Sequence, residues 1–301
     1  MTHNLPTIQV YCDEWDEYEL LDSGNRQKLE RFGRYVVIRE ELKAWWKPEL
    51  PPSEWKQAVA IHSGDERGAW EFRRKVASEW ELHFDRLTLE ARFTATSKHV
   101  GVFPEQAAHW RWIAEQIQRD ERTNLRVLNL FGYTGVASLV AASYGAAVTH
   151  VDAAKGVVAW GRENQERSGL SDLPIRWIVD DAMKFVEREI RRERQYDAIL
   201  LDPPSFGRGP NKELWKIEHR LGDLLDACRQ LLSDKPAFVL MTLYSLEQSS
   251  LLLANLLREM MRDFSGSIEI GELTLKPKAS DTILPMSLFG RWTSQNLSAD
   301  A

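Results

Sequence analysis

Cysteine, basic charge and long apolar runs are all scarce in this sequence, and each scarcity removes a class of protein. Two cysteines in 301 residues are too few for a disulfide framework, and neither Cys12 nor Cys228 has the close Cys or His neighbours that a zinc site needs. The histidines show no metal-binding spacing either. We therefore expect two reduced thiols and no bound metal.

The charge balance and the hydropathy pattern exclude two further classes. A net charge of -6 argues against a broad basic surface that binds nucleic acid by charge alone. No run of about eighteen apolar residues occurs, and the first residues lack the basic start and apolar core of a signal peptide. We expect a cytoplasmic protein that does not contact a membrane and whose nucleic-acid contacts, if any, are local.

What the sequence does contain is enough apolar material, 43% of residues, for one large core and a smaller second one. The pattern changes near residue 105. Before it, the run Leu87–Thr94 alternates apolar and polar residues as a half-exposed strand does, and Tyr35–Ile38 and Ala58–Ile61 are similar. We predict a mainly β domain over residues 1–104, which either recognises the substrate or covers the cleft of a second domain over residues 105–301.

This second domain begins with a helix over about 105–120, after which strands and helices alternate strictly. Strands are expected at Arg126–Phe131, Ala147–Asp152, Ile175–Asp181, Asp197–Asp202 and Ala237–Leu243. A last helix around Ser249–Asp263 leads to two further strand-like runs, Ser267–Leu275 and Ile283–Trp292, expected as an antiparallel pair at the sheet's edge. The predicted fold class is α/β, with a doubly wound, mostly parallel, seven-stranded Rossmann-like sheet.

Ligands of such sheets bind beyond the carboxyl ends of the strands, so the residues at those ends are the candidate site. The first strand leads into Phe131-Gly-Tyr-Thr-Gly135, where Gly132 and Gly135 permit a tight turn and a close backbone approach to a ligand. An ordinary strand-to-helix turn would look the same. Asp152 ends the second strand, where a carboxylate can accept hydrogen bonds from both hydroxyls of a ribose. Without the glycine loop nearby, Asp152 would be interpreted as a solvated strand end.

Asp181, at the end of the third strand, can accept a hydrogen bond from an exocyclic amine such as that of adenine, or cap the following helix, or both. Two classes of cofactor suit these strand ends. A nicotinamide cofactor favours the spacing G-x-G-x-x-G, which the loop F-G-Y-T-G-V-A lacks. Adenosylmethionine has no pyrophosphate and does not require that spacing.

The fourth strand ends in Asp202-Pro-Pro-Ser-Phe206. Pro203 and Pro204 have no N–H and a fixed φ, so the segment is stiff and offers carbonyl oxygens and one carboxylate to the cleft. Such acceptors can hold an amino or imide group of a planar substrate, and Phe206 is available to stack on a base. A proline-stopped strand with an exposed Asp is the alternative.

The motifs FGYTG and DPPSF, with acidic strand ends between them, resemble the class I adenosylmethionine-dependent methyltransferases, and more narrowly the bacterial large-subunit rRNA group that makes 5-methylcytosine or 7-methylguanine. The resemblance covers about residues 85–292. Pro104-Glu-Gln-Ala107 departs from the group's Asp-Gln-Arg run at that position. The resemblance implies a cofactor site made of Phe131, Gly132, Tyr133, Thr134, Gly135, Asp152, Asp181 and Asp202, and a catalytic segment made of Asp202, Pro203, Pro204, Ser205 and Phe206.

The atom that receives the methyl group is indicated by a missing residue. Methylation at C5 of a pyrimidine requires a nucleophile that first adds to C6. The 5-methylcytosine branch uses a cysteine near the end of the fifth strand, where this sequence has Tyr244 and Ser245. Cys12 is far upstream, and Cys228 lies in a pattern typical of a buried helix face. We therefore predict methyl transfer to a nucleobase nitrogen of rRNA.

Basic and aromatic residues that could contact RNA are scattered. The arginines at 188, 191, 192 and 194 alternate with glutamates, which favours a solvated helix face. Arg208 and Lys212 beside the DPPSF segment are better candidates, as are the cluster from Arg26 to Lys43 and the pair Trp45-Trp46. Two other functions stay open: methyl transfer to a protein or small molecule, and a non-catalytic module that binds adenosylmethionine or RNA.

Overall fold

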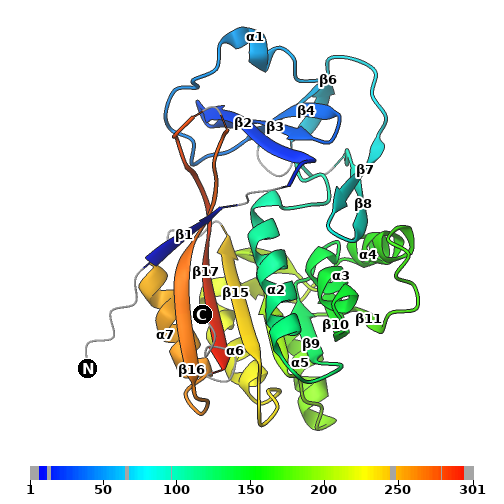
Figure 1. Ribbon diagram of the computed structural model, residues 1–301, viewed down its shortest axis with the longest axis vertical. Helices are drawn as coiled ribbons and strands as arrows, with labels where there is room; N and C mark the ends of the chain where they lie inside the picture. The colour runs from blue at the N-terminus through cyan, green and yellow to red at the C-terminus, as the bar shows by residue number, and fades with distance from the viewer. Residues whose placement is uncertain are drawn as a thin grey trace. The chain divides into compact units, whose positions relative to one another are not determined.

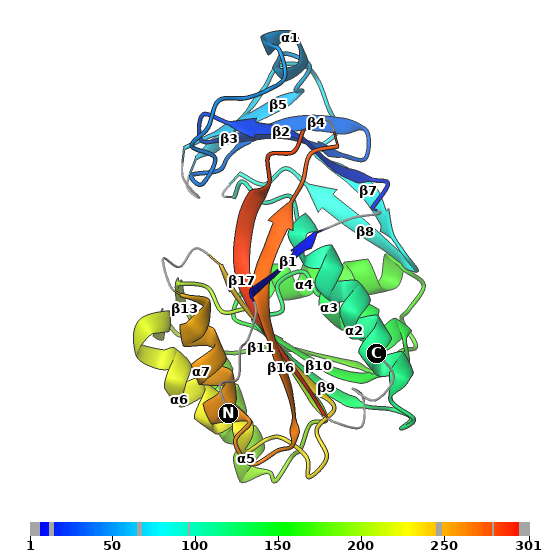
Figure 2. The same cartoon turned by 60° about the vertical axis from the view of Figure 1, so that its left-hand side comes forward.

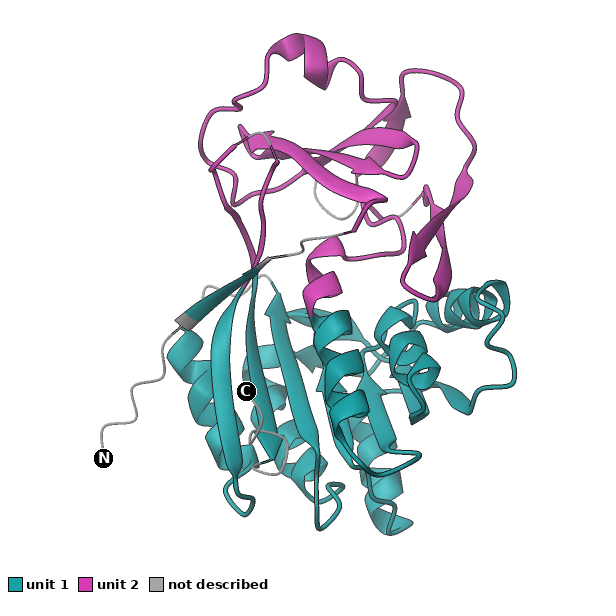
Figure 3. Cartoon of the chain, viewed as in Figure 1, with its two compact units in different colours: residues 1–10, 109–272, 287–301 teal, residues 11–108, 273–286 magenta. Residues whose placement is uncertain are grey.

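The computed structural model describes residues 7–11, 15–64, 68–95, 97–244, 249–278 and 280–294. Its contacts divide the chain into two compact units (Figure 3). Unit 1 comprises residues 1–10, 109–272 and 287–301, and unit 2 comprises residues 11–108 and 273–286. In the part of the chain that the structure describes, no helix is long and apolar enough to cross a membrane.

Unit 1 is built on an eight-stranded mixed sheet with the order β1-β16-β17-β15-β12-β9-β10-β11 (Figure 1). The five central and outer strands from β15 to β11 are parallel, and β17 runs antiparallel to β15. This confirms the predicted doubly wound, mostly parallel sheet. The strands are β1 (Thr7–Tyr11), β9 (Arg126–Leu130), β10 (Ala147–Asp152), β11 (Ile175–Val179), β12 (Ala198–Leu201), β15 (Phe238–Tyr244), β16 (Gly266–Leu275) and β17 (Leu284–Ser294).

The sheet has one strand more than the predicted seven. The additional strand, β1, lies outside β16, so the pair β16 and β17 does not form the sheet's edge as expected. A five-residue strand whose partner follows more than 250 residues later carries no local signal of its pairing. The predicted strands ending at Asp181 and Asp202 are shorter, because Asp181 caps the next helix and Asp202 begins a proline loop.

Helices cover both faces of this sheet, as Figure 2 shows. The helices on one face are α2 (Ala107–Arg119), α3 (Val136–Ser143) and α4 (Lys155–Arg167), and those on the other are α5 (Ala182–Arg191), α6 (Ile217–Arg229) and α7 (Ser250–Met260). The 3₁₀ turn Pro104–Gln106 leads directly into α2, so the helix expected over about 105–120 is confirmed, with its first residues in 3₁₀ form.

Two apolar cores result from strands that bury both faces. Leu128 and Leu130 pack toward α5, α6 and α7, whereas Val127, which precedes Leu128 and points to the other face, packs with Ile113 of α2 and Ala141 of α3. Parallel strands that are buried on both sides read as nearly continuous apolar runs, which is why their positions were visible in the sequence.

Unit 2 contains a five-stranded sheet in the order β2-β3-β4-β5-β6 and a separate hairpin of β7 and β8. The predicted strands near residues 35–38, 58–61 and 87–94 are confirmed. Its elements are β2 (Tyr18–Gly24), β3 (Gln27–Phe32), β4 (Tyr35–Glu40), α1 (Pro52–Trp55), β5 (Ala60–Ser63), β6 (Ala69–Phe72), β7 (Glu79–Phe84) and β8 (Leu87–Arg92).

A buried ionic cluster joins three strands of the five-stranded sheet. The fully buried carboxylate of Glu30 accepts two hydrogen bonds of 2.7 Å from the Arg39 guanidinium and one of 2.9 Å from the Tyr18 hydroxyl. The Lys28 ammonium lies 3.6 Å from the same carboxylate. Lys28 and Arg39, which belong to the basic cluster considered for RNA contact, are therefore engaged inside the unit.

We expect Glu30→Ala to lower the free energy of unfolding by roughly 3–5 kcal/mol, because it leaves the Arg39 guanidinium buried without its counter-charge. Urea denaturation measures the change. The matched control is Glu19→Ala, which removes the partly exposed ion pair with Arg31 in the same hairpin and should cost less than about 1 kcal/mol. Equal losses from the two variants would show that burial of the pair does not govern its contribution.

Candidate functional site

The candidate site lies at the carboxyl end of the parallel strands, where the winding of the sheet reverses. Strand β9 has β10 on one side and β12 on the other, although the chain visits β10 and β11 before it returns to β12. The pairing places Leu201, Leu130 and Val151 in one row across the three strands. The loops that follow those residues therefore leave the sheet side by side, which is the usual ligand position in such folds.

The loop after β9, residues 131–135, has a strained backbone. Phe131 and Tyr133 both have positive φ angles, 59° and 51°, which cost non-glycine residues energy and cluster at functional sites. The Gly132 amide donates to the Val151 carbonyl at 3.1 Å, and this bond ties the loop to the end of β10. Gly135, with φ of 83°, then begins α3.

Both glycines of this loop are required by what lies beneath them. A Cβ at Gly132 would stand 2.4 Å from the His150 ring, and one at Gly135 would stand 2.5 Å from the indole of Trp177. Gly161 in α4 approaches the same indole equally closely. The glycines thus permit close packing of the loop on the protein, in addition to the tight turn predicted from the sequence.

Three buried polar side chains lie beneath the loop. The Ser138 hydroxyl accepts a 2.8 Å hydrogen bond from the Asn129 amide and lies 3.0 Å from His150 Nδ1. Burial lowers the pKa of His150 to about 3, so the ring is neutral at physiological pH. Asn129 and His150 face each other across β9 and β10. Both are polar residues within apolar strands, which is a signal in the sequence, but neither is among the predicted site residues.

We expect the neutral state of His150 to make unfolding pH-dependent. Its pKa is lower in the folded than in the unfolded protein, so its contribution is complete above about pH 6.5 and is lost as the pH falls toward 3, by up to about 1.4 kcal/mol per pH unit. Urea denaturation at pH 7, 6 and 5 should show a smaller loss for His150→Asn than for the unchanged protein. Parallel losses in the two proteins would contradict a neutral buried His150.

Asp152 is the strand-end carboxylate next to this loop. Its Oδ2 accepts a 3.0 Å hydrogen bond from the Tyr133 amide, and its Oδ1 accepts one of 2.9 Å from the Ala154 amide. Burial raises its pKa, and the backbone amides that bond to it oppose that rise. Backbone amides do not fill every acceptor position of the carboxylate, so the ribose contact proposed from the sequence stays a prediction that this geometry permits.

The end of the third strand offers an apolar surface and a capped helix. Val179, opposite Asp152 in the strand pairing, is 40% exposed. Asp181 caps α5, and its Oδ1 accepts a hydrogen bond of 3.1 Å from the Lys184 amide. The prediction that Asp181 caps the following helix is thus confirmed. Its second carboxylate oxygen can still accept a hydrogen bond, so the contact with the adenine amine stays a prediction.

The segment from Asp202 to Phe206 follows β12 and is held by a residue that sequence reasoning missed. Trp215 is buried, its indole Nε1 donates to the Pro204 carbonyl at 2.6 Å, and its ring lies 4.9 Å from that of Phe131. One side chain therefore links the two loops of the site. The Pro204 carbonyl, which was expected to face a substrate, therefore already accepts a hydrogen bond from the protein.

The remainder of this segment turns back on itself. Phe206 opens the short strand β13 (Phe206–Arg208), which pairs with β14 (Leu214–Lys216), and the Ser205 carbonyl accepts from the Ile217 amide at 3.0 Å. The Phe206 ring is 53% exposed, as stacking on a base requires. Arg208 and Lys212, in the same hairpin, are exposed as well.

We expect Trp215→Phe to lower the rate of methyl transfer while the affinity for adenosylmethionine changes little, because phenylalanine keeps the packing against Phe131 but loses the hydrogen bond to Pro204. One lost bond of this kind is worth about 0.5–1.5 kcal/mol, or roughly a threefold to tenfold change in rate. Single-turnover transfer and calorimetric cofactor binding measure the two effects. An unchanged transfer rate would show that the bond does not position the segment.

The structure also locates the residues that bear on the acceptor atom. Cys228 is completely buried in α6, as predicted, and burial raises the pKa of its thiol. Tyr244 ends β15, whereas Cys12 and Ser245 lie outside the described residues. Among the residues that are described, no group of three or more His, Cys, Asp and Glu is placed to hold a metal ion.

A doubly wound sheet with a strained glycine loop after one strand, a buried carboxylate after the next and no G-x-G-x-x-G spacing defines a Rossmann-like protein that binds an adenosine-containing cofactor other than a dinucleotide. Comparison with known proteins agrees. A model of the S-adenosylmethionine-dependent methyltransferase family matches residues 63–253. The chain belongs to this family, and its cofactor is adenosylmethionine.

The chain is also similar to individual proteins. A crystal structure of an adenosylmethionine-dependent methyltransferase from Agrobacterium tumefaciens is 43% identical, with a TM-score of 0.92, over 98% of this chain and 97% of that one. The ribosomal RNA large subunit methyltransferase K/L of Pseudoalteromonas translucida is 34% identical over 44% of this chain, and that of Shewanella baltica is 37% identical over 36%. The matches span only 18% and 15% of those two longer proteins.

Proposed function

We propose that this methyltransferase transfers the methyl group of adenosylmethionine to a nucleobase nitrogen of ribosomal RNA. The observation that carries the proposal is the position of the stiff Asp202–Phe206 segment beside the strained Phe131–Gly135 loop, at the switch point of the sheet. An acceptor loop and a cofactor loop that leave adjacent strands can align a nucleophile with a methyl group. Such alignment can contribute roughly 7–11 kcal/mol to a transfer reaction.

The chemistry of the residues after β9, β10 and β11 suits the cofactor. Phe131, Gly132, Tyr133, Thr134 and Gly135 would surround its methionyl part. Asp152 would accept hydrogen bonds from the ribose hydroxyls, the exposed Val179 would offer an apolar surface to the adenine, and Asp181 would accept a hydrogen bond from the adenine amino group. Adenosylmethionine, when bound, supplies an electrophilic methyl group on a sulfonium.

The Asp202–Phe206 segment would hold the acceptor base. The Asp202 carboxylate accepts a hydrogen bond from an amino or imide group and so orients the neighbouring ring nitrogen. The exposed ring of Phe206 stacks on the base, a contact that is worth about 1–3 kcal/mol and is tolerant of sequence. Pro203 and Pro204 keep the segment rigid, and the bond from Trp215 fixes the Pro204 carbonyl.

A nitrogen acceptor is favoured because no described cysteine can act as the nucleophile that C5 chemistry needs. Cys228 is buried within α6 and its raised pKa keeps it a thiol. A ring nitrogen attacks a methyl group without covalent activation, so alignment alone suffices. Guanine fits the acceptor set slightly better, because it presents both an amino and an imide group.

RNA is favoured as the substrate class by the names of the K/L relatives and by exposed groups for stacking and charge contact. Trp45 in unit 2 is 80% exposed between Lys43 and Lys47, whereas the neighbouring Trp46 donates its indole N–H to the Ser23 carbonyl. In unit 1, Phe206 and Arg208 provide a second aromatic and basic pair. A protein or small-molecule substrate is the alternative that the same fold supports.

We expect Asp202→Ala to lower methyl transfer about 100-fold or more while calorimetric affinity for adenosylmethionine stays within a few-fold. Asp152→Ala is the matched control, since it should weaken cofactor binding first. Transfer is followed with labelled methyl groups into RNA, and digestion with ribonuclease or protease identifies the acceptor. Loss of both transfer and cofactor affinity in Asp202→Ala would make Asp202 a cofactor ligand, and label that only protease releases would exclude RNA as the substrate.

A further inference from the structure

A second pocket opens at the edge of the unit 1 sheet opposite to the candidate site. It has a volume of about 590 Å³, and its lining includes the residues that begin β9, β10 and β11 and the segment that leads into β12. The cofactor and acceptor loops follow the other ends of the same strands. Since β10 has six residues, the two edges are roughly 17 Å apart along the strand, and the pocket is separate from the transfer site.

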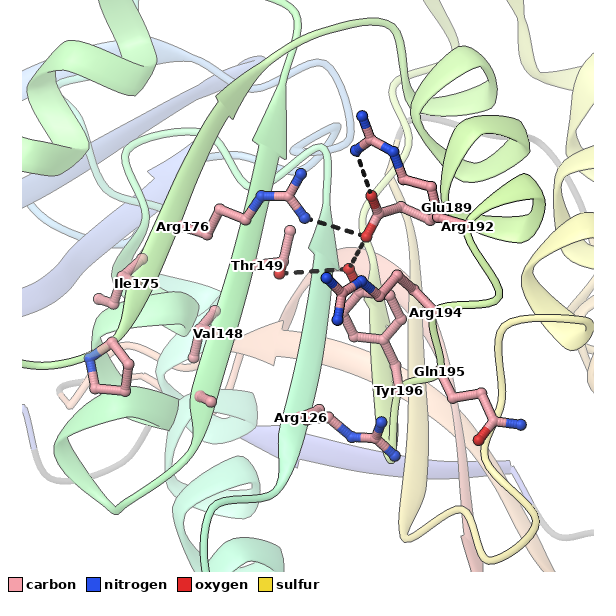
Figure 4. A pocket seen from close by; sticks show the side chains of 12 residues that line it. Arg126, Val148, Thr149, Ile175, Arg176, Glu189, Arg192, Arg194, Gln195 and Tyr196 are labelled. Atoms are coloured by element: carbon pink, nitrogen blue, oxygen red, sulfur yellow. Dashed lines mark hydrogen bonds and ion pairs between the residues drawn. The ribbon is translucent and has the colours of Figure 1, made fainter.

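Four of the twelve residues that line this pocket are arginines. They are Arg126 of β9, Arg176 of β11, Arg192 at the end of α5 and Arg194 in the loop after it (Figure 4). The exposure of Arg192 and Arg194 agrees with the solvated helix face expected from the sequence, but their convergence with Arg126 and Arg176 was not apparent, because those residues are distant in the chain.

A buried carboxylate fixes two of the arginines. The side chain of Glu189 is 1% exposed and accepts hydrogen bonds from Arg176 at 3.1 Å, Arg192 at 3.3 Å and the Tyr196 hydroxyl at 2.8 Å, and Figure 4 shows these groups converging on it. Burial alone would raise the pKa of Glu189, but the hydrogen bonds from Tyr196 and Arg176 outweigh it and lower the pKa, so the carboxylate is ionised. Its charge is shared between two arginines and does not neutralise both.

The remaining charges leave the pocket positive. Arg126 is paired with Asp197 through bonds of 3.2 and 3.3 Å. Among the residues that the structure describes, none forms a hydrogen bond or ion pair with the Arg194 guanidinium. Arg176 and Arg192 each use one terminal nitrogen on Glu189, which leaves further donors of the guanidinium for a ligand.

An apolar strip completes the lining. It consists of Ala147, Val148, Pro174 and Ile175. Val148 and Ile175 lie on the side away from Arg192 in Figure 4. Guanidinium groups in fixed positions are the usual partners of phosphate, which they bind in bidentate fashion. A ligand that fits both parts carries a phosphate and a flat or apolar group, and a nucleotide has both.

We propose that this pocket binds the phosphate of a nucleotide, either within an RNA strand or free in solution. The chain has a net charge of -6, so a phosphate ligand would be held by these local arginines and not by the overall field. If RNA is the source, the inference rests on the proposed function and provides an anchor for the strand at the far edge of the sheet. If a free nucleotide is the source, the pocket is a separate ligand site.

The test compares two double variants of the full chain. Arg192→Ala with Arg194→Ala removes two exposed arginines of the pocket, and the buried Glu189 keeps its bonds to Arg176 and Tyr196. Arg191→Ala with Arg258→Ala is the control: it removes the same charge from exposed positions that do not line the pocket. Calorimetric binding of adenosylmethionine should be the same in all three proteins, which verifies that the fold and the cofactor site are intact.

Two probes are used, a fluorescein-labelled single-stranded RNA of mixed sequence, followed by anisotropy, and ADP, followed by calorimetry. We expect the pocket variant to bind at least one probe about tenfold more weakly, with the control within about twofold of the unchanged protein. A loss confined to RNA identifies a strand as the source of the phosphate, and a loss for ADP identifies a free nucleotide. Equal binding by the two variants, or no binding of either probe to the unchanged protein, overturns the proposal.

Failure of this proposal and failure of RNA methylation are distinguishable, because the binding assays require no methyl transfer. If RNA is methylated but the pocket variant binds both probes normally, phosphate binding by the pocket is contradicted and RNA methylation is supported. If the pocket variant binds ADP more weakly and no methyl group is transferred to RNA, phosphate binding is supported and RNA methylation is contradicted.

Discussion

The parallel register of β12, β9 and β10 is the constraint on which the site depends. It places Leu201, Leu130 and Val151 in one row, so the proline segment, the glycine loop and the Asp152 carboxylate all begin at the same edge. Apolar residues on both faces of these strands hold that register, because a shift by one residue would exchange the two cores. Packing that is remote from the chemistry thereby fixes which loops meet.

Local side-chain contacts then fix the positions of the glycine loop and the proline segment. His150, Ser138 and Asn129 form a buried polar base under the glycine loop, and Trp215 ties the Pro204 carbonyl to the ring of Phe131. The strained angles at Phe131 and Tyr133 are maintained by these contacts. The protein's own contacts thus hold the loop that is predicted to surround the cofactor, and fixed loops are what transfer by alignment requires.

Much of the fold was predictable because the central strands are apolar on both faces and end in proline, glycine or aspartate. What escaped prediction depends on distant contacts. Strand β1 is short and pairs with β16, and residues 273–286 join unit 2, neither of which local periodicity indicates. Trp215 is one of twelve tryptophans, and nothing in its sequence neighbours shows that it bonds to Pro204. Charge was the least predictable property, since Lys28 and Arg39 are buried while Arg194 lines a pocket.

Mass spectrometry of nucleosides from ribosomal RNA tests the central claim most directly. The RNA is prepared from cells with and without the gene, and the purified protein and adenosylmethionine are then added back to the RNA that lacks the modification. We expect that one base methylated on nitrogen, most simply a guanine, is lost without the gene and restored by the protein. Restoration of 5-methylcytidine would contradict the nitrogen acceptor, and an unchanged set of nucleosides would contradict ribosomal RNA as the substrate.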